Sequence, residues 1–95
     1  MSERRQVIII DSQDNVATAI QNLAQGSRVP TERGEITLLK EIPFGHKFAL
    51  EDMASGDYVY KYGAAIGRAT EPIRRGDHVH VHNVEDITDE VRKEV

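Results

Sequence analysis

The fold class is decided by a stretch in which a turn leads into three tyrosines that alternate with Val and Lys, Gly56-Asp57-Tyr58-Val59-Tyr60-Lys61-Tyr62. Tyr and Val are enriched in β-strands, and Gly followed by Asp is typical of a turn. Working outward from this stretch, further short strands are predicted where apolar residues end at Gly, Pro or Asn, in the ranges 36–39, 46–50 and 78–82. Many short strands joined by glycine turns indicate a compact, mostly β domain.

The N-terminal part is predicted differently. The β-branched run from Val7 to Ile10 predicts a first strand that is buried on both faces. Capping side chains at 11–14 and a C-terminal cap at Gly26 frame a short N-terminal amphipathic helix. Its apolar face has the spacing i, i+4, i+7, i+8 and consists of Val16, Ile20, Leu23 and Ala24. No internal repeat is expected, and the charged tail at 85–95 is predicted to form a helical turn or stay mobile.

Size and composition limit the classes of protein. The 95 residues suit one domain, residues 1–95 with a core at about 7–84, and a core this thin gains stability from assembly. The net charge of −4 without a basic stripe argues against a nucleic-acid partner. The apolar run near the N-terminus is too short for a signal segment or a membrane span, which predicts a cytoplasmic protein with no membrane partner. The absence of cysteine excludes disulfides, thiolate metal sites and a cysteine nucleophile within this chain.

Three of the four histidines fall within five residues, in His78-Val79-His80-Val81-His82. On a strand these imidazoles would share one face at intervals of about 7 Å, with both valines in the core. Neutral imidazoles bind transition metals and transfer protons near neutral pH, so this face is a candidate catalytic or metal site. The alternative is a solvated polar face. Asn83 follows and would bind a substrate hydroxyl or carboxylate, or close a turn.

Two other segments are candidates for binding an anionic ligand. In Gly45-His46-Lys47, the glycine permits a close backbone approach while His and Lys address a carboxylate; the alternative is a surface loop. In the range 61–67, Lys61 would pair with an anionic substrate, Tyr62 would hydrogen-bond it, and the glycines Gly63 and Gly67 would permit close contact. The alternative there is a strand with a glycine bulge. No phosphate loop, dinucleotide fingerprint or serine nucleophile elbow is present.

Taken in order, the segments 42–50, 61–70 and 76–83 closely resemble the N-terminal SAF domain of altronate and galactarate dehydratases. The similarity runs from about Val7 to Val84. It implies a β-clip fold and a metal-dependent lyase that converts a sugar acid to a 2-keto-3-deoxy sugar acid. The long catalytic region of the single-chain members is missing here. The resemblance therefore implies a small subunit that is inactive without a large dehydratase subunit, with a homo-oligomer as an open possibility.

The resemblance also implies roles for individual residues. His80 and His82 are assigned as catalytic acid–base groups and as ligands of a divalent metal, Fe2+ or Mn2+, held mainly by the partner subunit. Lys47 and Lys61 are assigned to the substrate carboxylate. The remaining positions matching the family's substrate-binding motifs are His46, Tyr62, Gly63, Gly67 and Asn83.

Two alternative functions stay open. The first is the small subunit of (2R)-sulfolactate sulfo-lyase, in which sulfite leaves in place of water. The second belongs to another class, a non-catalytic SAF module that binds a sugar acid.

Overall fold

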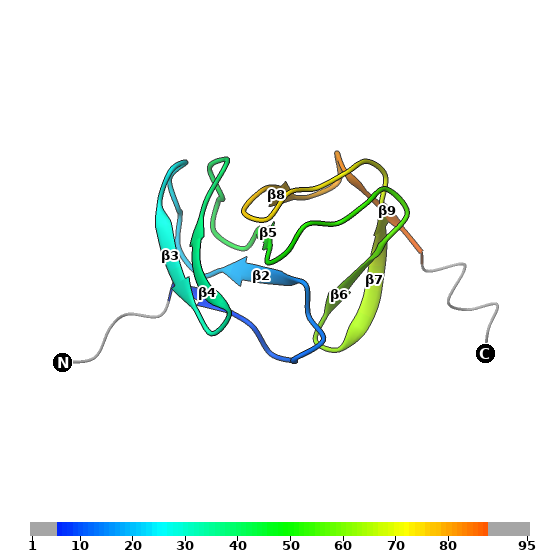
Figure 1. Cartoon of the computed structure of the whole chain (residues 1–95), viewed down its shortest axis with the longest axis horizontal. Coiled ribbons are helices and arrows are strands. Elements are labelled where there is room, and N and C mark those ends of the chain that lie inside the picture. Colours follow the sequence, from blue (N-terminus) through cyan, green and yellow to red (C-terminus); the bar gives the residue numbers. More distant parts are fainter. Residues whose placement is uncertain (1–5, 88–95) are drawn as a thin grey trace.

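The computed structural model describes residues 6–87, and all of its regular elements in that range are β-strands (Figure 1). A central antiparallel sheet has the strand order β1-β2-β5-β8, with a hairpin on one side and a three-stranded sheet on the other. The central strands are β1 (Val7–Ile8), β2 (Val16–Ala19), β5 (Lys47–Ala49) and β8 (His78–Val79). The hairpin pairs β3 (Arg28–Thr31) with β4 (Gly34–Thr37), and the third sheet holds β6 (Tyr58–Lys61), β7 (Ala64–Ala69) and β9 (Val84–Asp86). The mostly β prediction is confirmed.

The predicted N-terminal helix is wrong. Residues 16–19, which were expected to begin the helix, form strand β2, and Gly26 is the turn glycine before β3 rather than a helix cap. β2 pairs with β1 on one edge and with β5 on the other, so its backbone groups are satisfied in a sheet. Successive residues of β2 also enter different apolar clusters, Ala17 one and Val16 the other. Burial on both faces therefore overrides the helical spacing, which needs only one apolar face.

The strand that is buried on both faces is thus a central one, not the first. β1 holds only Val7 and Ile8 and forms the edge of the sheet. Ile10, which was expected in the core, is 62% exposed. In β5, Phe48 packs into the same cluster as Ala17 and Ala49 into the same cluster as Val16, so the middle of the sheet divides the core in two.

Four turns share one short pattern, which corrects the expectation of no internal repeat. Each contains a glycine with φ between +85° and +95°, a backbone conformation that favours glycine. Buried apolar residues lie three positions before and three positions after that glycine. The four units are Leu23-Gly26-Val29, Ile42-Gly45-Phe48, Met53-Gly56-Val59 and Ile73-Gly76-Val79. Bridges pair Leu23 with Ile42 and Met53 with Ile73, so the units meet two by two.

The described fold extends beyond the predicted core limit at residue 84. β9 pairs with β7, and Ile87 is buried, so the first residues of the predicted tail belong to the domain. The rest of the tail, residues 88–95, lies outside the described residues. Among residues 6–87, no helix is long and apolar enough to cross a membrane.

Candidate functional site

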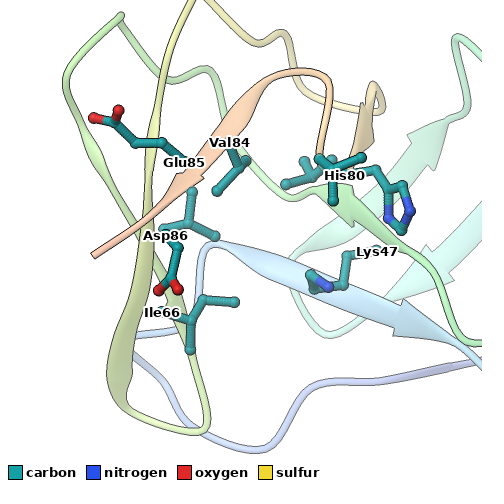
Figure 2. Close-up of a pocket in the computed structure, with 9 residues that line it drawn as sticks. Lys47, Ile66, His80, Val84, Glu85 and Asp86 are labelled. Carbon is teal, nitrogen blue, oxygen red and sulfur yellow. The ribbon is translucent and has the colours of Figure 1, made fainter. Parts of the chain in front are cut away.

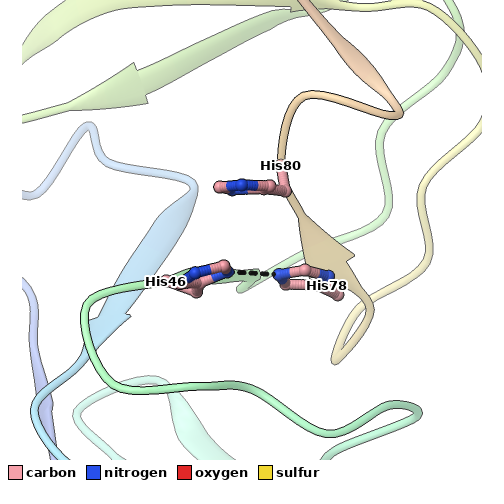
Figure 3. Close-up of side chains that lie close together, drawn as sticks. All are labelled: His46, His78 and His80. Carbon is pink, nitrogen blue, oxygen red and sulfur yellow. Dashed lines mark hydrogen bonds between the residues drawn. The ribbon is translucent and has the colours of Figure 1, made fainter.

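Three histidines from two distant segments form one cluster, consisting of His46, His78 and His80 (Figure 3). His46 directly follows the turn glycine before β5, and His78 begins β8. Because β5 and β8 are antiparallel, with Phe48 opposite His78, the two segments bring their imidazoles together. His46 Nδ1 lies 2.9 Å from His78 Nε2. The His80 ring stacks on the His46 ring, with centroids 4.2 Å apart and an interplanar angle of 17°.

The predicted strand through the histidine segment ends early. β8 contains only His78 and Val79, and a turn follows at 81–83. Val79 is fully buried as expected, but Val81 is 82% exposed instead of lying in the core. His82 is exposed at the edge of the cluster, with its ring 5.4 Å from that of His78 and tilted by 32°. His80 therefore joins His46 and His78 rather than pairing with His82.

The buried amide of Asn83 fixes this turn. Its Oδ1 accepts a hydrogen bond from the His80 backbone N–H at 2.9 Å, and its Nδ2 donates to the His78 carbonyl at 2.8 Å. The Asn83 backbone N–H donates to the His80 carbonyl as well. These bonds match the turn-closing alternative and hold the two cluster histidines at a set spacing. A substrate contact by Asn83 stays a prediction.

The surroundings of the cluster favour neutral imidazoles. Burial lowers the pKa of His78, and nearby His46, His80 and His82 lower it further, with Asp77 opposing them. Burial likewise lowers the pKa of His80, followed by the effects of His46, Lys47 and His82. A neutral imidazole has a free nitrogen lone pair near neutral pH, so it can accept a proton or bind a metal ion.

The donor set of the cluster fits a divalent transition metal. One nitrogen from each of the three histidines lies within 4.8 Å of the other two. Metal–nitrogen bonds of about 2.0–2.1 Å in a tetrahedron place ligand nitrogens about 3.3 Å apart, so modest side-chain rotations would suffice for binding. Three imidazoles without a carboxylate or thiolate suit Zn, Fe, Ni or Cu better than Ca or Mg.

Lys47 lies next to this cluster on β5 and is half-buried. Burial lowers the pKa of Lys47, and the positive charge of Lys61 lowers it further. Within residues 6–87, no carboxylate lies within ion-pair distance of Lys47. A desolvated ammonium group without a counter-ion is a candidate site for an anion.

Lys47 and His80 also line one side of a pocket of about 220 Å³ (Figure 2). Glu85 and Asp86 of β9 line the opposite side, and valines and an isoleucine form the walls between them. His80 and Lys47 therefore share one accessible cavity, whereas Lys61 and His82, which were expected around the same pocket, do not line it.

The residues predicted to contact a substrate in the range 61–67 lie in the β6–β7 hairpin, where local structure accounts for the residue types. Tyr62 and Gly63 form the tip between β6 and β7 with φ of 57° and 76°. The Gly63 N–H donates to Asp14 Oδ1 at 2.8 Å, and a Cβ at position 63 would approach Asp11. In β7, a Cβ on Gly67 would collide with Val84. Substrate contacts by Tyr62, Gly63 and Gly67 stay predictions.

Asp14 is a buried residue that sequence reasoning missed. Its carboxylate accepts hydrogen bonds from the backbone N–H groups of Gly63 and Asp11. Burial acts to raise the pKa of Asp14, but these and other backbone hydrogen bonds outweigh it and lower the pKa. Asp14 therefore ties the loop before β2 to the β6–β7 hairpin. No local signal in the sequence distinguishes it from the capping residue that the helix prediction assumed.

The chain is similar in sequence to two altronate dehydratases and to a subunit of a sulfo-lyase. The sequence pattern described as "Altronate/galactarate dehydratase SAF domain" matches residues 5–87. The altronate dehydratase of Escherichia coli (strain K12) is 47% identical over 78 residues, which cover 82% of this chain and 16% of that protein. The altronate dehydratase of Bacillus subtilis (strain 168) is 40% identical over 76 residues, or 80% of this chain and 15% of that protein.

A third relative is a short protein. The (2R)-sulfolactate sulfo-lyase subunit alpha of Chromohalobacter salexigens is 56% identical over 43 residues, which cover 45% of this chain and 46% of that subunit. The chain thus spans less than one-fifth of the two dehydratases and about half of the subunit.

Proposed function

The chain belongs to the family of SAF domains of altronate and galactarate dehydratases, and from this premise we propose that it is the small subunit of a metal-dependent sugar-acid hydro-lyase. The catalytic region that fills the rest of the dehydratases is then a separate, larger polypeptide, and the isolated chain is inactive. The observation that carries the proposal is the cluster of His46, His78 and His80 beside Lys47. The proposed location is the cytoplasm.

The proposed reaction removes water from a 2,3-dihydroxy acid. A base takes the proton from C2, the C3 hydroxyl leaves after protonation, and the resulting enol becomes a 2-keto-3-deoxy acid. His82, at the exposed edge of the cluster, is proposed as the acid–base group. His80 lines the pocket and its pKa is lowered, but once it binds the proposed metal ion its lone pair is no longer free to accept a proton.

A divalent ion is proposed at the cluster, and of the expected Fe2+ and Mn2+ the three imidazoles favour Fe2+. His46, His78 and His80 would hold it, with the larger polypeptide supplying the other ligands. When bound, such an ion stabilises negative charge on the substrate carboxylate and its enolate. His82 was expected as a ligand together with His80, and the spacing of the nitrogens favours His46 and His78 instead.

Lys47 and Lys61 are proposed to bind the substrate carboxylate. The two ammonium groups are close enough for Lys61 to lower the pKa of Lys47. A carboxylate between them would relieve this repulsion and raise the pKa of Lys47 again. The lysines thus favour an acid over a neutral sugar.

The second candidate function is the alpha subunit of a sulfolactate sulfo-lyase. The 56% identity with the Chromohalobacter protein, which is itself a subunit, favours it. The same base and the same carboxylate site would serve, and sulfite would leave in place of water.

The test is to exchange the matching parts. In one fusion, the full chain replaces the matching segment of the E. coli altronate dehydratase; in a second experiment, it replaces subunit alpha of the Chromohalobacter sulfo-lyase. Altronate- and galactarate-dependent formation of a 2-keto acid, together with sulfite release from sulfolactate, is then measured with Fe2+ or Mn2+. Turnover by the dehydratase fusion supports the first proposal, and sulfite release alone supports the second. Failure of both would leave only a non-catalytic binding module.

A further inference from the structure

The pocket beside the histidine cluster has mostly apolar walls. Val59, Ile66, Val79 and Val84 line it, and none of these side chains donates or accepts a hydrogen bond. Its volume of about 220 Å³ is below the range of about 300–1,000 Å³ that is typical of small-molecule sites. It therefore has the size and lining of a pocket for one apolar side chain.

A sugar acid is a poor occupant for these walls. Each of its hydroxyl groups would lose water without gaining a partner from valine or isoleucine, which is unfavourable. Polar side chains line only two sides of the pocket, Lys47 and His80 on one and the carboxylates of Glu85 and Asp86 on the other, and the carboxylates would repel an acid (Figure 2). The apolar part of the pocket therefore suits an occupant other than the substrate.

The rim of the pocket exposes apolar surface as well. Val81, which lines the pocket, is 82% exposed, and Ile66 is 38% exposed. The turn that Asn83 fixes holds Val81 outward in this position. The exposed Val81 thus extends the apolar surface of the cavity, and a continuous exposed apolar surface is typical of an interaction site.

The relatives indicate what covers this surface. More than four-fifths of each altronate dehydratase lies outside the part that matches this chain, so a much larger region accompanies the domain there. We infer that the pocket and Val81 form the docking surface for that catalytic region, which inserts one aliphatic or aromatic side chain between Val84 and Ile66. The inference rests on the proposed function, since the partner is the catalytic region of a dehydratase.

Docking at this pocket would also affect the candidate site, because the two share residues. His80 and Lys47 belong both to the pocket wall and to the candidate site. A partner side chain seated in the pocket therefore brings the catalytic region over the histidine cluster and excludes water from it. Docking and completion of the active site become one event.

The test measures docking without turnover. The full chain is titrated by isothermal calorimetry into the E. coli altronate dehydratase from which the matching segment has been deleted. Val81→Asp places a charge at the contact, and Ile10→Asp, at an equally apolar exposed position outside the pocket lining, is the matched control. We expect the wild-type chain and Ile10→Asp to bind alike and Val81→Asp to bind at least tenfold more weakly, with unchanged circular dichroism.

Three binding results would overturn the inference. They are equal binding by Val81→Asp, no binding by the wild-type chain, and self-association of the chain that Val81→Asp abolishes, which would make a second copy the occupant. A galactarate titration that shifts the NMR signals of Val59 and Ile66 in the isolated chain would likewise make the pocket a substrate site. The fusion assay tests the proposed function independently of docking. The covalent link gives the domain a high effective concentration at the catalytic region even where docking is weak. An inactive fusion together with Val81-dependent binding would reject the function and keep the surface.

Discussion

His46 Nδ1 and His78 Nε2 lie 2.9 Å apart although 32 positions separate the two residues in the chain. Both residues follow a turn of the same type, His46 directly after Gly45 and His78 two positions after Gly76. The strands that leave these turns, β5 and β8, are antiparallel neighbours. The repeated turn thus places one imidazole directly before β5 and the other at the start of β8, and the cluster follows from the architecture of the domain rather than from adjacent residues.

Removing a cluster histidine should weaken metal binding by the isolated chain. We expect His78→Ala to reduce affinity for Co2+ at least tenfold, because it leaves His46 and His80 without the third nitrogen. His82→Ala, the matched control, should have a smaller effect, since the His82 ring lies at the exposed edge. Calorimetry and the visible spectrum of bound Co2+ would measure both. A larger loss with His82→Ala than with His78→Ala would return the metal site to the His80–His82 pair.

The stability of the metal-free chain should depend on pH below neutrality. The pKa values of His78 and His80 lie below their ordinary 6.5 in the folded chain, mainly because of burial. Between the folded pKa and 6.5, the unfolded chain binds more protons, so the free energy of unfolding falls as the pH is lowered through this window. Urea unfolding at pH 7.5, 6.5 and 5.5 in the presence of a chelator would show the decrease. His78→Asn/His80→Asn should flatten it, and an equally steep decrease in this double variant would contradict the assignment.

Much of the fold could be predicted from residue types. Tyr and Val around position 59 and the glycine turns correctly indicate short strands. The helix prediction failed because the spacing of Val16, Ile20 and Leu23 reports only that these residues are apolar, not that they face one side. In the structure, β2 is buried on both faces, a tertiary condition that no local pattern contains.

The candidate site could be predicted only in part. His80, His46 and Lys47 were identified and do lie together. His78 was grouped with the motif but given no role, and Val81 was placed in the core, because strand periodicity was extended through a turn. Asn83 marks that turn, but its hydrogen bonds to His78 and His80 depend on backbone geometry that the sequence does not specify.

Asp14 should stabilise the domain without taking part in metal binding. Asp14→Ala leaves the part-buried Gly63 N–H without its charged acceptor, which costs about 1–3 kcal/mol of unfolding free energy. The pKa of Asp14 is lowered, so its contribution is present at neutral pH and is lost only as the pH falls below the ordinary value of 3.8. Chemical unfolding at pH 7 would measure the loss, with the exposed neighbour Gln13→Ala as control. Equal stability of the two variants would exclude this role.

Two variants of Asn83 can distinguish a role in positioning the histidines from a contact with the substrate. Asn83→Asp keeps an acceptor for the His80 N–H but loses the donor to the His78 carbonyl, whereas Asn83→Ala loses both bonds. If Asn83 positions the histidines, Co2+ affinity should fall stepwise in the isolated chain, by about 10-fold to 100-fold for the alanine variant, because its bonds to the backbone of His78 and His80 orient both metal ligands. Unfolding free energy should fall by about 1–3 kcal/mol in parallel. A pure substrate role predicts unchanged metal affinity and stability, with an increase in KM appearing only in the active fusion. These two patterns do not overlap, so calorimetry and urea unfolding on three proteins decide between them.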